Sequence, residues 1–96
     1  MLKDRLVALL NERAEFLRES DVLELRLFGS VARGEERDDS DIDVLVRFTS
    51  PPTFDNYMNL KFMLEDALGR RVDLVTFDGL REEIREEVLA EALRVA

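Results

Sequence analysis

Apolar residues follow two different periods along the chain, and these periods predict where the helices and strands lie. Leucines at helical spacing predict an amphipathic helix over residues 2–18. Alternating apolar residues predict strands over residues 22–28 and 41–48, and a short apolar run predicts a third strand over residues 72–77. Each of the first two strands has one apolar face, so each is expected to cover a core on that side only.

Two further helices are predicted after the second and third strands. The Ser-Pro-Pro segment at residues 50–52 ends the second strand, because proline cannot donate a backbone hydrogen bond. Thr53 is then a candidate N-cap for a helix that runs to about Leu68 and is closed by Gly69. A last apolar stripe predicts a helix over residues 80–95. The expected fold class is α+β, a small sheet flanked by helices.

Length and composition restrict the function more than the fold. The 96 residues have room for a single domain, residues 1–96, so a substrate-gripping lobe has to come from a partner or from another copy in a homo-oligomer. The chain has 22 acidic against 14 basic residues, a net charge of −8, and we expect no groove for DNA. The absence of Cys and His excludes disulfides, thiolate nucleophiles and the commonest general base. No apolar run approaches the roughly 20 residues of a membrane span, so we expect a cytoplasmic protein without membrane contact.

Three aspartates stand at the starts of predicted strands. Asp41 and Asp43 are two residues apart and point to the same face of their strand, about 6.5–7 Å from each other along the backbone. Like charges this close are costly unless a cation lies between them, and carboxylate oxygens are ligands that Mg²⁺ accepts. Asp73 opens the third strand in the same way, and a helical crossover permits the second and third strands to be parallel neighbours. The three carboxylates are therefore expected at one edge of a mixed sheet.

A Gly-Ser bend precedes these aspartates by ten residues. Gly29 allows a phosphate to approach the backbone, and the Ser30 hydroxyl with free N–H groups offers a phosphate cradle. If the bend and the aspartates hold one metal–triphosphate, the first two strands must be antiparallel neighbours. In this arrangement Asp73 can complete a metal shell and accept the proton of an attacking hydroxyl.

The sequence partly matches two other motifs, a phosphate-binding P-loop and a calcium-binding EF-hand, but both lack required residues. Gly29 and Gly34 have the glycine spacing of a P-loop, but Glu35–Glu36 occupies the positions of its Lys and Ser/Thr. The alternating aspartates imitate an EF-hand loop, but Val44 replaces its turn glycine and Ser50 its bidentate glutamate. The sequence therefore predicts neither a P-loop nor an EF-hand.

The combined motif resembles a known family. Residues 29–34 (GSVARG) followed by residues 40–43 (SDID) are similar to the signature of the minimal nucleotidyltransferases of the DNA polymerase β superfamily. The resemblance covers nearly the whole chain and implies a polymerase-β-like palm, ATP as donor with two Mg²⁺ ions, and nucleotidyl transfer to a hydroxyl. By position, Asp41 and Asp43 would ligate the metal and Asp73 would be the third carboxylate.

The same resemblance assigns the phosphate-binding residues. Ser30 with Gly29 would bind the triphosphate, although Ser30 could instead be an ordinary helix cap. Arg33 could contact phosphate or acceptor, or it could form a surface salt bridge with Glu36 or Asp38.

The resemblance also suggests a partner. Many proteins of this family are antitoxins for a HEPN-domain toxin, a ribonuclease whose tyrosine they adenylylate, and this is the first hypothesis for the chain. Two alternatives stay open: an antitoxin-type binding module without catalysis, and nucleotidyl transfer to a small molecule. The helix over residues 53–68 has more apolar positions than one small sheet needs, so its exposed remainder is a candidate partner site.

Overall fold

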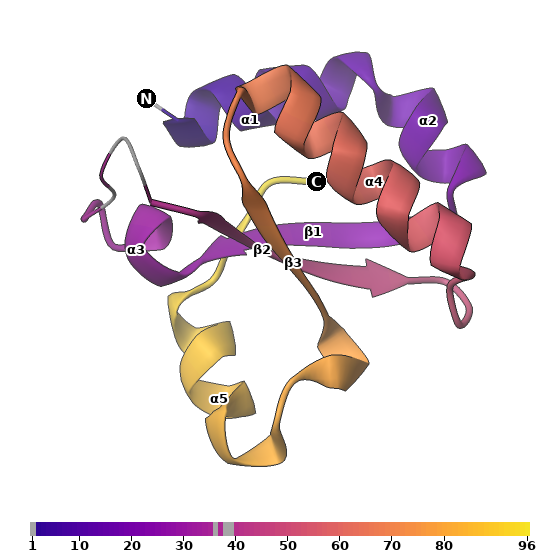
Figure 1. Cartoon of the computed structure of the whole chain (residues 1–96). Helices are drawn as coiled ribbons and strands as arrows, with labels where there is room; N and C mark the ends of the chain where they lie inside the picture. The colour runs from indigo at the N-terminus through magenta and orange to yellow at the C-terminus, as the bar shows by residue number, and fades with distance from the viewer. Residues whose placement is uncertain (1, 36, 38–39) are drawn as a thin grey trace.

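The computed structural model describes residues 2–35, 37 and 40–96 and has the predicted α+β architecture (Figure 1). Helices and strands alternate along most of this part of the chain, and a 3₁₀ turn, η1, separates the third strand from the last helix. The elements in chain order are α1 (Leu2–Glu12), α2 (Ala14–Glu19), β1 (Val22–Phe28), α3 (Gly29–Ala32), β2 (Ile42–Phe48), α4 (Phe54–Leu68), β3 (Val72–Thr76), η1 (Phe77–Gly79), α5 (Glu82–Glu91) and β4 (Leu93–Arg94).

The strands form one mixed sheet in the order β3-β2-β1-β4. β1 and β2 are antiparallel neighbours, whereas β2 and β3 are parallel, with α4 as the crossover between them. Both pairings confirm the predicted topology. The fourth strand was not predicted: β4 pairs antiparallel with β1, with Arg94 opposite Arg26 and Leu93 opposite Leu27.

The core lies between the sheet and the layer formed by α1, α2 and α4, while α5 lies on the other side of the sheet (Figure 1). The fully buried side chains come from the inward stripes of α1 and α4 and from one face of β1 and β2: Leu6, Leu10, Leu25, Leu27, Ile42, Val44, Val46, Leu60 and Leu64. This burial confirms the predicted apolar face of the second strand and, for Leu25 and Leu27, that of the first. The predicted inward position of Leu23 is wrong: its side chain is 54% exposed, because the pairing of β1 with β2 is irregular between Val22 and Glu24. None of the helices in the described residues is both long enough and apolar enough to cross a bilayer.

Two predicted helices differ from the structure. The first helix is divided at Arg13, where the backbone leaves helical values (φ −107°, ψ 21°), and α2 then brings Leu17 into the core. The last helix ends at Glu91 rather than near Val95. The backbone of Ala92 is extended, and the N–H of Val95 donates to the carbonyl of Leu25 at 2.9 Å. Helical spacing alone could not predict this end, because the sheet edge competes for the same backbone groups.

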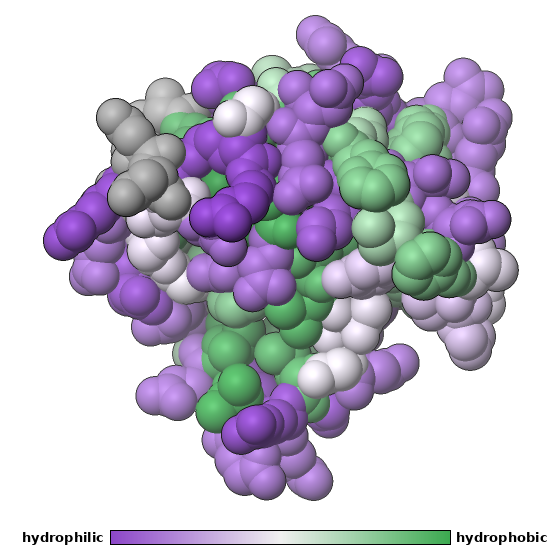
Figure 2. Space-filling view, in the orientation of Figure 1, coloured by the Kyte–Doolittle hydropathy of each residue, from purple (hydrophilic) through white to green (hydrophobic). Residues whose placement is uncertain are grey.

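Helix α4 begins and ends at the predicted residues. The Thr53 side chain accepts a hydrogen bond from the N–H of Asn56 at 3.0 Å, and Gly69 ends the helix in the left-handed region (φ 66°). The opposite face of this helix is exposed, with Phe54 77% and Phe62 55% accessible. Figure 2 shows pale green, hydrophobic side chains on the surface over α4. The predicted exposed remainder of this helix is therefore present.

Truncating side chains on the two faces of α4 should reduce stability to very different extents. Leu60→Ala leaves a cavity in a fully buried position and is expected to lower the free energy of unfolding by about 2–5 kcal/mol. Phe62→Ala, two residues away on the exposed face, is expected to change it by less than about 0.5 kcal/mol. Urea denaturation of both variants measures the difference, and equal losses would contradict the packing described here.

Candidate functional site

Strand register brings two of the predicted aspartates side by side. Phe28 at the end of β1 pairs with Asp43 near the start of β2, and Asp43 pairs in turn with Asp73 near the start of β3. In adjacent strands, directly paired residues project to the same face of the sheet. The carboxyl groups of Asp43 and Asp73 therefore share one edge of the sheet and one face, as the sequence predicted.

The glycine bend lies directly against Asp43. Gly29 follows Phe28 with φ of +71°, a left-handed conformation that glycine adopts without strain. A Cβ atom built on Gly29 would lie 2.2 Å from Oδ2 of Asp43, well inside van der Waals contact. The absence of a side chain at this position is what allows the backbone and the carboxylate to approach each other.

Asp41 lies just before β2 rather than in it. Its Oδ1 is 3.4 Å from Nε of Arg71, and its side chain is half exposed. Arg71 precedes β3 as Asp41 precedes β2, so the parallel pairing places the two residues next to each other. The N–H of Ile42 also donates to the carbonyl of Arg71 at 2.9 Å, which ties the two strand entrances together.

Asp43 is affected by its burial and by the charges of its neighbours. Partial burial raises the pKa of Asp43, and the negative charges of Asp73 and then Asp41 raise it further. The guanidinium of Arg33 opposes this effect and lowers the pKa. Asp43 is thus a carboxylate whose ionised form is disfavoured by its surroundings, and a bound cation would relieve that cost.

Ser30 and Arg33 lie in and just after the short helix that follows the bend. The N-cap of α3 is Phe28, without a side-chain capping bond, so the alternative role of Ser30 as the helix cap is wrong. Arg33 lies 3.3 Å from a carboxylate oxygen of Glu35 and 3.2 Å from one of Glu91. The other salt-bridge partners considered for it, Glu36 and Asp38, lie outside the described residues.

Arg70 is a residue of this region that the sequence reasoning missed. Its Nη2 donates to the carbonyl oxygen of Ser40 at 2.6 Å and also to that of Arg37. These contacts hold the backbone immediately before Asp41. The parallel pairing of β2 and β3 was the available signal, because it places the residues that precede both strands together.

The donor set fits a hard divalent cation. Asp41, Asp43 and Asp73 offer only oxygen, which Mg²⁺ prefers. The pKa of Asp43 is raised first by burial and then by the charges of Asp73 and Asp41, and a bound cation would counter all three effects. Within residues 2–35, 37 and 40–96, no three acidic side chains already stand in a ligating arrangement. Asp41 is instead directed to Arg71. Asp41, Asp43 and Asp73 would hold the metal together if the Asp41 side chain turned from Arg71 toward the other two carboxylates.

The raised pKa of Asp43 predicts how stability depends on pH without metal. The unfolded chain loses this proton first, so between the ordinary Asp pKa and the raised folded pKa the folded state binds more protons. Stability should therefore fall as pH rises through this window. The difference in melting temperature between the protein and its Asp43→Asn variant, measured in EDTA across acidic pH, should grow accordingly. A difference that is independent of pH would contradict the electrostatic description.

Comparison with known proteins places this geometry in a family. The nucleotidyltransferase domain family matches residues 10–95. The protein adenylyltransferase MntA of Thermococcus cleftensis is 43% identical over 74 residues, which cover 77% of this chain and 75% of that protein.

Similar solved structures support the same family assignment. A structure assigned to a minimal nucleotidyltransferase has a TM-score of 0.81 and 42% identity, covering 95% of this chain and 93% of that one. A crystal structure of a toxin–antitoxin with AMP-PNP has a TM-score of 0.72 and 25% identity, covering 90% of this chain and 71% of that one. The chain is a nucleotidyltransferase and belongs to the family of minimal nucleotidyltransferases with the polymerase-β-like fold.

Proposed function

We propose that this protein moves AMP from ATP to a tyrosine hydroxyl of a HEPN-domain toxin and thereby acts as its antitoxin. Residues 1–96 would act as one domain, in the cytoplasm. The observation that carries the proposal is the register of Asp43 with Asp73 against the side-chain-free bend at Gly29. This arrangement supplies carboxylates and an open backbone at a single point, as transfer of a nucleotide requires.

Each residue of the site has a role in the proposed transfer. Asp41, Asp43 and Asp73 would hold Mg²⁺, which when bound stabilises negative charge on the phosphates and on the attacking and leaving oxygens. Gly29 and the Ser30 hydroxyl would hold the triphosphate, with Arg33 near it. Asp73 would accept the proton of the attacking hydroxyl. The new oxygen–phosphorus bond forms at the α-phosphate as the bond to pyrophosphate breaks, and pyrophosphate leaves.

The comparisons support the donor and the partner in general terms. The Thermococcus relative is named a protein adenylyltransferase, which supports AMP as the group transferred and a protein as the acceptor. The structure of a toxin–antitoxin with AMP-PNP, an analogue of ATP, supports an ATP donor and an antitoxin role.

The direct test uses ATP labelled at the α-phosphate. The protein is incubated with this ATP, Mg²⁺ and the product of its neighbouring gene, and label is followed by electrophoresis and located by mass spectrometry. We expect label on a tyrosine of the partner and none when Mg²⁺ is chelated. Label on no protein, or transfer that persists in chelator, would overturn the proposal. Transfer to a small hydroxyl compound alone would favour the small-molecule alternative.

Inhibition of the partner by binding alone, without transfer of AMP to it, is the second candidate, and the exposed face of α4 favours it. Phe54 and Phe62 expose large aromatic side chains on a helix whose other face is already packed. A partner that docks on this helix could be inhibited without any transfer. Neutralisation of the partner by a protein unable to transfer AMP would favour this second candidate over the first.

A further inference from the structure

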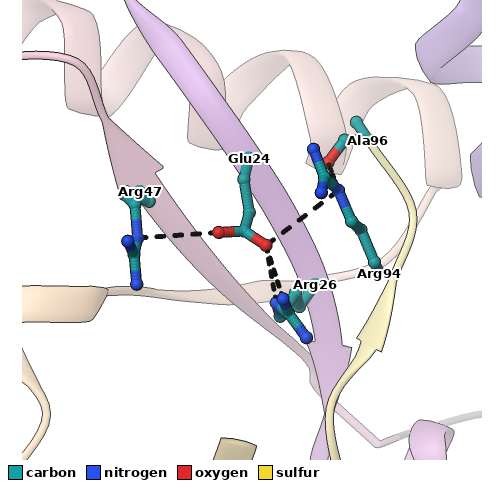
Figure 3. Close-up of polar contacts among 5 residues, drawn as sticks. All are labelled: Glu24, Arg26, Arg47, Arg94 and Ala96. Atoms are coloured by element: carbon teal, nitrogen blue, oxygen red, sulfur yellow. Dashed lines mark hydrogen bonds and ion pairs between the residues drawn. The ribbon is translucent and has the colours of Figure 1, made fainter.

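Three arginines surround one glutamate on the face of the sheet that is opposite α1, α2 and α4 (Figure 3). Arg26 lies closest, with Nε 2.8 Å and Nη2 2.7 Å from Oε2 of Glu24. Arg47 Nε lies 3.5 Å from Oε1, and Arg94 Nε lies 4.0 Å from Oε2 and donates to the carbonyl of Ala96 at 3.2 Å. We call Arg26, Arg47 and Arg94 the arginine surface.

The arginine surface keeps positive charge in an acidic protein. Glu24 is the only acidic side chain of the described residues within 4 Å of these three guanidinium groups, so one carboxylate side chain faces three guanidinium groups. The side chain of Glu24 is 14% exposed, whereas those of Arg26, Arg47 and Arg94 are 30%, 43% and 63% exposed. Guanidinium N–H groups therefore remain open to solvent, although the whole chain has a net charge of −8.

This surface is on the same face of the sheet as the aspartates. Along β2, Asp43 and Arg47 are four residues apart and project to the same side, a separation of about 13 Å. Arg26 pairs with Leu45, halfway between them. The Gly29–Ser30 bend lies beyond Asp43 in the opposite direction. The aspartates thus separate the bend from the arginine surface.

The order of these parts indicates which substrate lies over the arginines. In an in-line displacement the attacking and leaving oxygens are on opposite sides of the phosphorus. If the leaving pyrophosphate is held at the Gly29–Ser30 bend, the acceptor has to arrive from the side of the arginine surface.

An apolar cleft extends the same surface. It has a volume of about 340 Å³ and is lined by Arg47, Phe77 and the two prolines Pro51 and Pro52, among others. The guanidinium carbon of Arg47 lies 4.0 Å from the centre of the Phe77 ring, which holds the arginine in place. A cleft of this size can take a side chain next to Arg47.

We propose that the arginine surface binds an acidic segment of the acceptor protein, next to the hydroxyl that receives AMP. This inference rests on the proposed function. Arginine guanidinium groups bind carboxylates through charge-assisted hydrogen bonds, and Arg26 already holds Glu24 with two nitrogens directed at one oxygen, Oε2. The three arginines extend over only β2, β1 and β4, about 10 Å, which suits two or three carboxylates. A nucleic-acid backbone carries charge along its whole length and would need a longer basic stripe than these three arginines provide.

The test measures binding in EDTA without ATP, so its outcome is independent of AMP transfer. The probes are a fluorescent tyrosine peptide with flanking aspartates and glutamates, the same peptide with asparagines and glutamines, and an oligoadenylate of equal charge. The variant Arg47→Glu/Arg94→Glu keeps Arg26, the closest partner of Glu24. The matched control, Arg5→Glu/Arg18→Glu, makes the same charge change at exposed positions of α1 and α2.

We expect the unmodified protein to bind the acidic peptide at least about tenfold more tightly than the neutral one, less so at high salt. The variant at Arg47 and Arg94 should lose this preference, and the control should keep it. Equal binding of both peptides, equal losses in variant and control, or tighter binding of the oligoadenylate would each overturn the proposal. The labelled-ATP experiment tests the transfer reaction separately.

Discussion

The Asp43→Asn variant is expected to lose AMP transfer by about 10³-fold or more and to be more stable than the unmodified protein when metal is absent. In the proposed function Asp43 holds the metal, so its loss should remove several kcal/mol of transition-state stabilisation, and each 1.36 kcal/mol corresponds to a tenfold change in rate. The gain in stability follows because Asn removes a charge that burial, Asp73 and Asp41 all disfavour. A gain of roughly 0.2–1 kcal/mol is expected for like charges on neighbouring strands.

Thermal melts with and without Mg²⁺ separate the two effects. Ligand that binds only the folded state raises the melting temperature of the unmodified protein, and this increase should be nearly absent in Asp43→Asn. Asp66→Asn, the same chemical change at an exposed position of α4, should retain both transfer and the response to Mg²⁺. If Asp43→Asn retained transfer, the site would have to lie elsewhere. If it lost transfer but still neutralised the partner, binding alone would explain the antitoxin role.

The Gly29→Ala variant is expected to lose most of its transfer activity and about 1–3 kcal/mol of stability. Part of the loss in stability comes from forcing alanine into a left-handed conformation (φ +71°). The larger effect on activity comes from the new methyl group, whose carbon would lie 2.2 Å from Oδ2 of Asp43. Either the carboxylate or the bend has to move, and the proposed phosphate site changes with it.

Gly69→Ala provides the matched control for this prediction. Gly69 has nearly the same backbone conformation (φ +66°), but a Cβ there would have no atom within 4 Å. Gly69→Ala should therefore lose a similar amount of stability from backbone strain while keeping its transfer activity. Urea denaturation and the labelled-ATP assay measure both quantities. Equal activity in the two variants would show that the contact between Gly29 and Asp43 has no role in transfer.

The site could be predicted from the sequence largely because it depends on strand register. The spacing of Asp41 and Asp43, a crossover helix and a bend at Gly29 together required an antiparallel and a parallel pairing, and both are present. The parallel pairing follows from the crossover helix, whereas the antiparallel pairing follows from the expectation that the bend and the aspartates hold one metal–triphosphate. Their combination places Asp43 opposite Asp73 without any information on side-chain contacts.

The parts that were missed depend on tertiary contacts. β4 has only two residues, and its extended backbone is stabilised by β1 rather than by its own sequence pattern. The contacts of Arg70 and Arg71 with the entrance of β2 also needed the pairing of β2 with β3 first. The arginine surface joins residues from three strands, and nothing in the spacing of Arg26, Arg47 and Arg94 indicates that they meet at Glu24.

Asp73 belongs to an edge strand of the sheet, since within the described part of the chain β3 pairs only with β2. Edge strands separate from a sheet more easily than central strands, because fewer backbone hydrogen bonds are lost. Detachment of β3 would remove one carboxylate from the other two while β1, β2 and much of the packed interior stayed folded. On heating, the transfer activity should therefore be lost at a lower temperature than the one at which the whole protein unfolds. The decline of activity with temperature should come before the melting transition.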